Sequence, residues 1–370
     1  MVGRDRAHCS ARTGPLSDVT VDRRHFLHFT GLAFGGVMVL ASCGRVGGRT
    51  AGPTEPVPPA SATPDAPPRV SRNYSYATVE YPKSVKTTLY GINNKGETAG
   101  YFADGKGVHG FLRSVGGEFS DAVDHPEAGN ATALLGLNDT GDVVGYYHGK
   151  SGQGGYPGSI SLPSRGVFSF VYSLGAKKFE PIAPPEDGIG TVVAFGINDS
   201  GLVSGWYFAQ DTSGRSEAIV KGFVWSKAAR GYVDTFRYGD EAGEGTFATG
   251  INGAGLVVGQ FVGKDKARHA FVRDSKRRLV ISSVDHPNAR EPEGGTCAMA
   301  ISDSGVVAGI YQDRQGGRAY LRADQDTFVE LRHPDAASDM SACGINASGK
   351  VVGDFYDSRG TTLGYLATPA

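Results

Sequence analysis

Three histidines stand directly before a proline in the same sequence pattern, and two of them also follow an aspartate. An aspartate beside a histidine is a pairing that general acid–base catalysis uses. The pattern recurs, however, at one place in a repeated unit, the end of its outermost strand, where a repeated polar residue usually terminates or caps the strand. We therefore favour a structural role for these histidines, with catalysis as the alternative. The three segments are Asp124-His125-Pro126, Asp285-His286-Pro287 and Arg332-His333-Pro334.

A second group of polar residues comes just before the innermost strand of each repeated unit. If the units surround one axis, four carboxylates from consecutive units would repel one another unless a cation or a cationic ligand lies among them. Oxygen ligands from loops favour Ca²⁺ over Zn²⁺, which would require His or Cys. In the alternative interpretation these residues are solvated loop acids that never meet. The group comprises Lys86, Asn130, Asp187, Glu244, Glu293 and Asp339.

The composition favours many short strands joined by tight turns. Glycine accounts for 55 of the 370 residues, while charged residues make up 20% and aromatic residues 10%. With 37 basic and 38 acidic residues the net charge is −1, so neither nucleic acid nor an anionic membrane surface is an implied partner. The sequence contains no zinc-ligand spacing, P-loop, nucleophile elbow or dinucleotide-binding fingerprint.

Six copies of one block organise the chain into six units. Each block reads Asn or Ser, two residues, Gly, three residues, Gly, one residue and an aromatic, without a gap in any copy. The segment Asn-x-x-Gly between two apolar runs predicts a tight hairpin turn, because the Asn side chain bonds the turning backbone and Gly takes a positive φ. The residue triplets that open the first to sixth blocks begin at Gly91, Gly136, Gly196, Gly250, Ala300 and Gly344.

Four strands are expected in each unit of 44–60 residues, which is the pattern of a β-propeller blade. An inner strand precedes the turn, a second strand follows it, and a third and a fourth come next; the first unit's fourth strand is expected over 119–126. The sixth unit ends before its fourth strand, and residues 76–82 resemble the missing copy. The sequence therefore predicts an all-β, six-bladed β-propeller whose N-terminal strand completes the last blade and closes the ring.

His269-Ala270-Phe271, together with the recurring Gly-Ile-Asn and Val-Val-Gly segments, resembles the repeat of the bacterial extracellular HAF family. The resemblance covers residues 76–370. It implies an exported protein with propeller-like repeats, and it implies no catalytic residues. Ala300-Ile301-Ser302 in the fifth unit departs mildly from the pattern and keeps the turn.

The N-terminal residues resemble an export signal. Arg23 and Arg24 precede an apolar stretch of about 13 residues, too short to span a membrane, in the manner of a twin-arginine signal. Leu40-Ala41-Ser42-Cys43 resembles the lipobox of bacterial lipoproteins, in which the cysteine becomes lipidated. We expect a signal peptide over 1–42, a Pro-rich linker over 43–75 with the lipid on Cys43, and the propeller over 76–370.

Cys297 and Cys343 are the two cysteines within the expected propeller. They lie three positions and one position before the starts of the fifth and sixth blocks, and this offset of two places them on the same face of adjacent inner strands. A disulfide between them suits an oxidising compartment, provided that the inner strands come close enough. Two separate buried thiols are the alternative.

The sequence favours a monomeric recognition module over an enzyme. Loops of variable length are expected on one face around the axis, and loops on a rigid scaffold usually carry binding. We expect an exported, membrane-anchored lipoprotein that binds a glycan or an envelope protein, contacts the membrane only through its lipid and binds no nucleic acid. The alternative is a calcium-dependent hydrolase or lyase that acts on an extracellular lactone, ester or saccharide at the channel mouth. The variable loops are 148–165, 210–221, 237–245 and 288–295.

Overall fold

The computed structural model describes residues 70–150, 166–211, 218–238, 242–290, 294–324 and 326–370, with the side chains of 242–244 left out. This part of the chain contains strands and turns and no helix, so the expectation of an all-β fold is confirmed. Within these residues no helix is long and apolar enough to cross a membrane. The expected export signal, Arg23, Arg24 and the lipidated Cys43 lie outside the described residues.

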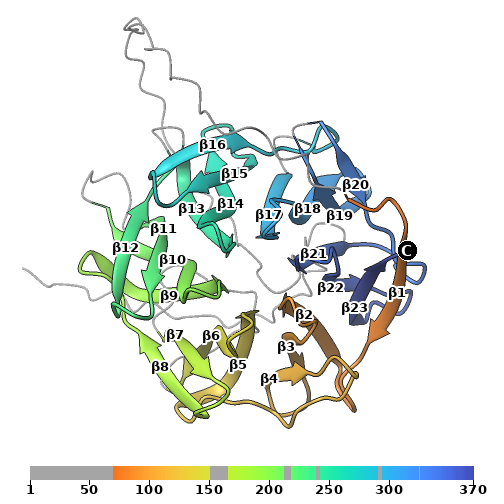
Figure 1. Cartoon of the computed structure of the whole chain (residues 1–370), viewed down its shortest axis with the longest axis horizontal. Helices are drawn as coiled ribbons and strands as arrows, with labels where there is room; N and C mark the ends of the chain where they lie inside the picture. Colours follow the sequence, from red (N-terminus) through yellow and green to blue (C-terminus); the bar gives the residue numbers. More distant parts are fainter. Residues whose placement is uncertain (1–69, 151–165, 212–217, 239–241, 291–293, 325) are drawn as a thin grey trace, which may run out of the picture.

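The strands of each unit lie side by side, one after another outward from a common axis, as in a β-propeller (Figure 1). Closest to the axis is one strand of each unit, which contains the residues before the hairpin turn. These inner strands are β2 (Lys86–Ile92), β5 (Ala128–Leu137), β9 (Gly188–Ile197), β13 (Ala242–Ile251), β17 (Gly295–Ile301) and β21 (Met340–Ile345).

The second and third strands of each unit continue the antiparallel order outward. The second strands are β3 (Thr98–Ala103), β6 (Asp142–Gly149), β10 (Leu202–Gln210), β14 (Leu256–Gly263), β18 (Val307–Asp313) and β22 (Val351–Tyr356). The third strands are β4 (Val108–Arg113), β7 (Val167–Ser173), β11 (Ala218–Ser226), β15 (Arg268–Asp274), β19 (Gly316–Arg322) and β23 (Thr362–Pro369).

Outer strands are present in five units. In the first unit the fourth strand expected over 119–126 is reduced to two isolated bridges, Gly110 with Val123 and Arg113 with Phe119. The prediction of a regular strand there was wrong. The outer strands are β8 (Lys178–Ile182), β12 (Gly231–Phe236), β16 (Leu279–Ser283), β20 (Phe328–Glu330) and, for the sixth unit, β1 (Tyr74–Val79).

The N-terminal strand belongs to the C-terminal unit, as the sequence predicts. Strand β1 pairs with β23 in antiparallel register from Tyr74 opposite Pro369 to Val79 opposite Gly364. The strands form sheets of four, seven and twelve strands, because single parallel bridges such as Val108 with Ala131 join some neighbouring units, and none of these sheets closes on itself.

The second glycine of each block lets the second strand lie against the inner strand. A Cβ atom added at Gly145 would overlap the carbonyl oxygen of Ala133, and one added at Gly259 would overlap that of Phe247. The corresponding glycines of the other four units meet a carbonyl oxygen of their own inner strand in the same way. This close approach is why glycine recurs there six times.

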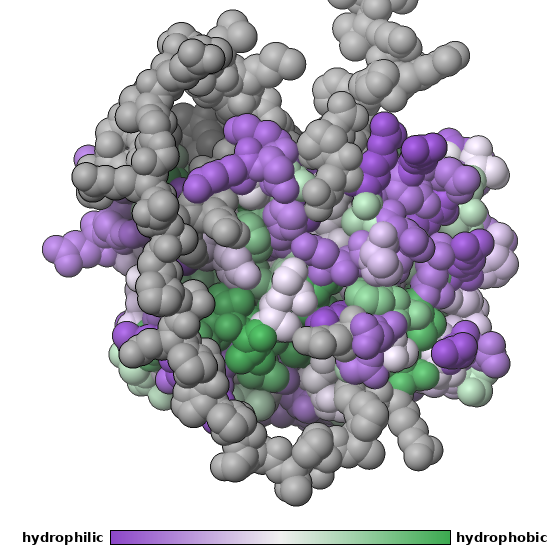
Figure 2. Space-filling model, turned by 90° about the horizontal axis from the view of Figure 1, so that it is seen from above, coloured by the Kyte–Doolittle hydropathy of each residue, from purple (hydrophilic) through white to green (hydrophobic). Residues whose placement is uncertain are grey.

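Apolar side chains also reach the rim. Figure 2, a view of the rim from above, shows apolar side chains gathered among hydrophilic ones. The outer strands contribute exposed apolar residues that include Val233 of β12 and Leu279 and Ile281 of β16. Exposed apolar side chains are common on folded proteins and need no binding partner to explain them.

In the five blocks that begin with asparagine, this residue bonds its own turn and the turn of the next unit. We call these five asparagines and Ser302 of the fifth block the asparagine ring. The asparagine Oδ1 accepts a hydrogen bond from the N–H four residues later, at 2.8 Å for Asn138 and 2.9 Å for Asn252. Its Nδ2 donates to the carbonyl oxygen of the equivalent residue in the next unit. These inter-unit bonds run from Asn93 to Asn138 (3.3 Å), Asn138 to Asn198 (3.0 Å), Asn198 to Asn252 (2.9 Å), Asn252 to Ser302 (3.1 Å) and Asn346 to Asn93 (3.0 Å).

The ring lacks one bond because Ser302 has no amide to donate to the carbonyl of Asn346. Its hydroxyl still accepts from the N–H of Val306 at 3.1 Å, so the turn itself is kept. A cavity of about 250 Å³ lies beside Ser302 and Asn346, which leaves space for a longer side chain.

We expect Ser302→Asn to stabilise the fold, because it completes the ring. The gain in the free energy of unfolding should be about 1 kcal/mol, the usual net value of one buried hydrogen bond, measured by urea denaturation. Asn252→Ser is the matched control, since it removes the same bond from the preceding junction and should lower stability by a similar amount. Equal stability of both variants and the parent would contradict the role of the ring.

Candidate functional site

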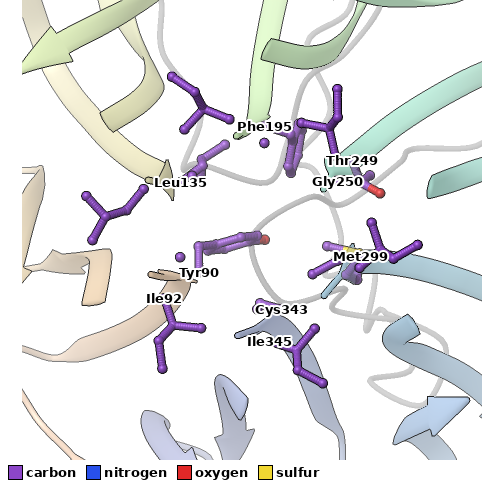
Figure 3. A pocket seen from close by; sticks show the side chains of 18 residues that line it. Tyr90, Ile92, Leu135, Phe195, Thr249, Gly250, Met299, Cys343 and Ile345 are labelled. Atoms are coloured by element: carbon purple, nitrogen blue, oxygen red, sulfur yellow. The ribbon is translucent and has the colours of Figure 1, made fainter. Parts of the chain in front are cut away.

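The axis is lined by one bulged residue from each inner strand. Every inner strand shows a register shift against its second strand just before the Gly-Ile-Asn triplet, as between Leu134 and Gly136 or between Ala298 and Ala300. The residue that the shift skips in the strand register is of a different type in each unit, and all six line the same axial cavity (Figure 3). They are Tyr90, Leu135, Phe195, Thr249, Met299 and Cys343.

The axial cavities are small. The one at the bulged residues measures about 80 Å³, and the one at the asparagine ring is of the same size. Each has room for two or three water molecules, whereas small-molecule sites usually enclose several hundred Å³. These two parts of the axis are therefore suited to water rather than to a substrate.

Cys297 and Cys343 are separate, buried thiols, so the suggested disulfide is not formed. The two residues occupy different positions in their inner strands. Cys343 is the bulged residue of its strand and lines the axial cavity, whereas Cys297 is paired regularly with Ile310 and is equivalent to Ser341. Side chains two positions apart do lie on one side here, because the hydroxyl of Ser341 is 3.2 Å from Cys343 Sγ; the two cysteines nevertheless belong to different inner strands and are not bonded.

The expected group of carboxylates at the channel mouth is seen only in part. Asp187 accepts hydrogen bonds from Lys221 Nζ at 2.7 Å and from the Tyr207 hydroxyl at 3.0 Å. Asp339 accepts one from the backbone N–H of Gly317. Glu293 and the side chain of Glu244 lie outside the described residues. The two carboxylates that are described have separate partners.

The electrostatics of Asp187 follow from those partners. Partial burial raises the pKa of Asp187, but the bonds from Lys221 and Tyr207 outweigh it, so the pKa lies below its ordinary value. Among the described residues no three His, Cys, Asp or Glu side chains are grouped closely enough to hold a metal ion. The calcium site, which needs Glu244 and Glu293 as well, stays a prediction.

The other two candidates at the mouth differ in their surroundings. Asn130 is exposed. Lys86 is half-buried, with Nζ 5.6 Å from the centre of the Tyr101 ring. Burial lowers the pKa of Lys86, and the nearby carboxylate of Asp354 opposes that shift.

Asp354 is a fully buried carboxylate that sequence reasoning did not single out. It accepts hydrogen bonds from the hydroxyls of Thr88, at 3.1 Å, and of Ser341. Thr88 belongs to the first unit and Asp354 to the sixth, so the contact joins the two ends of the repeat. The sequence does mark Asp354, because it directly follows the second glycine of its block and is the one charged residue at that position. The equivalent residues are Tyr101, Tyr146, Trp206, Gln260 and Ile310.

The histidines before proline are structural. Each ring stacks on the block aromatic of the following unit: His125 on Tyr147 at 3.8 Å, His286 on Tyr311 at 3.7 Å and His333 on Phe355 at 4.1 Å between ring centres. Tyrosines do the same at the equivalent places, with Tyr81 on Phe102 and Tyr238 on Phe261.

These three histidines are also fixed by hydrogen bonds. The Nδ1 atom of each ring accepts a hydrogen bond from the backbone N–H two residues further along the chain. The donors are Asn288 for His286, Glu127 for His125 and Asp335 for His333. An Nδ1 that accepts carries no proton, so the neutral ring is favoured. Desolvation by burial lowers the pKa of His286 to about 4.

The aspartates before these histidines bind different partners. Asp285 bonds the Nδ1 atom of His269 at 2.8 Å, and Asp265 approaches its Nε2 atom at 3.0 Å. Burial lowers the pKa of His269, but the two carboxylates outweigh it and hold that pKa above its ordinary value. Asp285 therefore pairs with His269 of its own unit and not with the adjacent His286, and this contact fixes the third strand.

A groove of about 400 Å³ lies on the outer side of the molecule, where β8 of the second unit meets β11 and β12 of the third. Its apolar lining comes from Phe179, Trp225 and Tyr232 together with two prolines, and its charged lining from Lys178, Glu180 and Arg230. Arg230 Nη2 approaches Glu180 Oε1 at 3.5 Å. The Tyr232 hydroxyl donates to the carbonyl oxygen of Ala183 at 2.6 Å, which ties the two units together.

No family model and no curated protein matches the chain. Among solved structures it is similar to the lectin of Aleuria aurantia, described as a six-bladed β-propeller with fucose recognition, at 13% identity, with a TM-score of 0.46 and 78% of this chain and 93% of that chain covered. It is similar to a luciferin-regenerating enzyme at 11% identity, with a TM-score of 0.47, 80% and 95% covered. It is also similar to virginiamycin B lyase from Staphylococcus aureus at 9% identity, with a TM-score of 0.41 and 80% of this chain and 99% of that chain covered. Similarities this low assign no function.

The buried thiols should react only after unfolding. Burial raises the pKa of Cys297 to about 11, and the thiolate is the reactive form of cysteine. In a chain with Cys9→Ser and Cys43→Ser, Ellman's reagent should titrate both remaining thiols in concentrated guanidinium chloride and neither in the folded protein. A denatured sample that shows no thiol until a reductant is added would restore the disulfide.

His286→Tyr should reduce the acid sensitivity of the fold. Between pH 6.5 and about 4 the unfolded chain binds a proton at His286 that the folded chain does not, so stability falls as the pH falls. His286 should therefore account for about 2 kcal/mol of the loss in unfolding free energy between about pH 7 and pH 5. Urea denaturation of the variant at both pH values should lack that part of the loss.

Tyr81 and Tyr238 already occupy the equivalent position, so the stacked ring should be preserved in this variant. His269→Gln is the control with the opposite sign. Its raised pKa stabilises the fold at low pH and loses that contribution as the pH rises through the folded pKa. An unchanged pH dependence for His286→Tyr would show that the ring is protonated without cost.

Proposed function

We propose that this chain is an exported, lipid-anchored, six-bladed β-propeller that acts as a recognition module for a glycan or protein ligand at the cell envelope. The blade count is supported by the six sequence units and by the pairing of β1 with β23. The bond from Asn346 to Asn93 supports closure, because it joins the last unit to the first in the same way as the other neighbours.

The observation that carries recognition is the outer groove between the second and third units. It combines aromatic and proline surfaces with a carboxylate and two cations in about 400 Å³, within the range of small-molecule sites. The side chains that first suggested chemistry have structural partners, since His125, His286 and His333 are stacked and Asp187 is paired with Lys221. Binding is the function that the groove supports best.

The proposed localisation of the protein rests on its N-terminal sequence. Arg23 and Arg24 before an apolar stretch, and Leu-Ala-Ser before Cys43, support export through the twin-arginine route and lipidation at Cys43. The Pro-rich linker over 43–75 would hold the propeller away from the bilayer, where a ligand of the envelope is within reach.

The test is a binding screen with the full chain carrying Cys43→Ala, which removes the lipid attachment residue. We expect saturable binding to one class of saccharide on a glycan array or to one segment on a peptide array of envelope proteins. The same protein after heat denaturation is the control for non-specific adsorption. Absence of saturable binding on both arrays would contradict a recognition function.

A further inference from the structure

The neighbouring junction, between the third and fourth units, shows how the outer groove is filled elsewhere in the molecule. There Arg273 of β15 donates to Asp234 Oδ2 of β12 from Nε at 3.2 Å and from Nη2 at 2.8 Å. The guanidinium also lies 4.3 Å from the centre of the Phe236 ring. Arg278, from the turn before β16, approaches the same carboxylate at 3.8 Å. Both Arg273 and Asp234 are buried.

Strand register identifies the equivalent residues at the groove. Val171 faces Glu180 as Val224 faces Asp234, so Glu180 occupies the position of Asp234. Val203 faces Trp225 as Val257 faces Arg273, so Trp225 occupies the position of Arg273.

The turn residues correspond in the same way. Arg230 and Arg278 each directly precede the outer strand of their unit, and both have a positive φ, 51° and 56°. Each arginine approaches the carboxylate of the preceding unit. The two junctions therefore share a carboxylate and an exposed arginine and differ in the third residue, which is Trp225 or Arg273.

The replacement of arginine by Trp225 changes both the space and the charge. An indole cannot form the two hydrogen bonds that satisfy Asp234, so Glu180 is left with contacts of 3.5 Å to Arg230 and 3.9 Å to Lys178, both on the exposed side. The side chain of Glu180 is 26% exposed, against 6% for Asp234. An open groove with a hydrogen-bonding carboxylate next to an aromatic lining results.

We infer that this groove is a saccharide-binding site, in which a sugar ring packs on Tyr232 and on the small exposed part of Trp225, which is 5% exposed, while Glu180 and Arg230 bind its hydroxyl groups. The inference rests on the proposed function and names its site and ligand class. A pyranose has an apolar face of C–H groups and a rim of hydroxyls, and it matches an aromatic surface bordered by one acceptor and one planar donor. The groove volume accommodates one or two sugar residues.

A proline-rich peptide is the competing ligand, because aromatic grooves also accept polyproline segments. Arg230 and Lys178 can donate to the carbonyls of such a peptide, but proline has no N–H to donate to Glu180, whereas the hydroxyls of a sugar can. The carboxylate at the centre of the charged side of the groove therefore favours the hydroxyl-rich ligand.

The experiment uses tryptophan fluorescence of the full chain with Cys43→Ala. The chain has two tryptophans. Both are buried, Trp206 at 1% and Trp225 at 5% exposure, but Trp225 lines the groove and Trp206 does not, so a change on ligand addition reports on Trp225. The probes are a panel of neutral and acidic methyl glycosides, the oligosaccharides bound on the glycan array, and a peptide with the sequence of residues 52–68 as the proline-rich competitor. We expect a saturable change with a saccharide and none with the peptide.

Two substitutions test the site. Trp225→Arg rebuilds the arrangement of Arg273 and Asp234, should fill the groove while keeping the fold, and should weaken saccharide binding about tenfold or more. Glu180→Gln keeps the shape, removes the charge and should weaken binding by a similar factor, measured by calorimetry or on the array. Arg278→Gln is the matched control, since it changes the equivalent arginine at the filled junction and should leave affinity within about twofold.

Each outcome decides a different point. Saccharide binding that is unaffected by Trp225→Arg and Glu180→Gln would overturn the groove as the site and leave the recognition function standing. Fluorescence changes produced by the proline-rich peptide in place of saccharides would overturn the ligand class. Lack of binding to every saccharide and every envelope peptide would remove the proposed function together with this inference. If Trp225→Arg does not fold, Glu180→Gln alone decides.

Discussion

The double use of one asparagine side chain sets the geometry on which the rest of this molecule depends. Its carbonyl oxygen accepts from the backbone of its own turn, and its amide nitrogen donates to the turn of the next unit. Only an amide side chain of this length supplies an acceptor and a donor in opposite directions at a tight turn. As a result the inner strands are held at one height around the axis, and the register of each unit is tied to that of its neighbour.

Fixing the inner strands has consequences at increasing distance from the axis. The bulge before each triplet turns one residue toward the axis, the second glycine admits the second strand, and the block aromatic receives a His or Tyr from the preceding unit. Five of the six junctions repeat the stacked ring; at the junction of the second and third units the block aromatic Tyr207 donates a hydrogen bond to Asp187 instead. The junction of the sixth and first units adds the bond from Thr88 to Asp354 and the pairing of β1 with β23, so the chain ends are held by side chains as well as by a strand.

The sequence was informative where a contact demands a residue type. Asn and Gly at the turn, Gly in the second strand and the ring before proline all recur, so the strands and the structural role of His286 could be predicted. The bulge could not be predicted, because Tyr90, Leu135 and Cys343 have nothing in common except their position. The channel mouth depends on loops whose course no repeat constrains. The partner of Asp187 was not foreseen either, because Lys221, which the sequence assigns to a variable loop, lies in β11 opposite Tyr207.

Positions that differ among the units also differ in whether the nearby polar groups find hydrogen-bond partners within the fold. This distinguishes positions that stabilise the fold from positions that could bind a ligand. Asp354 is a charged departure that is fully buried and accepts bonds from two hydroxyls, so its polar atoms are used within the fold. The position of Trp225 varies among the units, being Tyr172 in the preceding unit and Arg273 in the next. With Trp225 there, Glu180 lacks the hydrogen bonds that Asp234 receives from Arg273. A carboxylate that keeps only long contacts beside an aromatic lining gains most from a ligand that has both hydroxyl groups and an apolar face. The outer groove is therefore where the repeat leaves interaction energy available for a ligand.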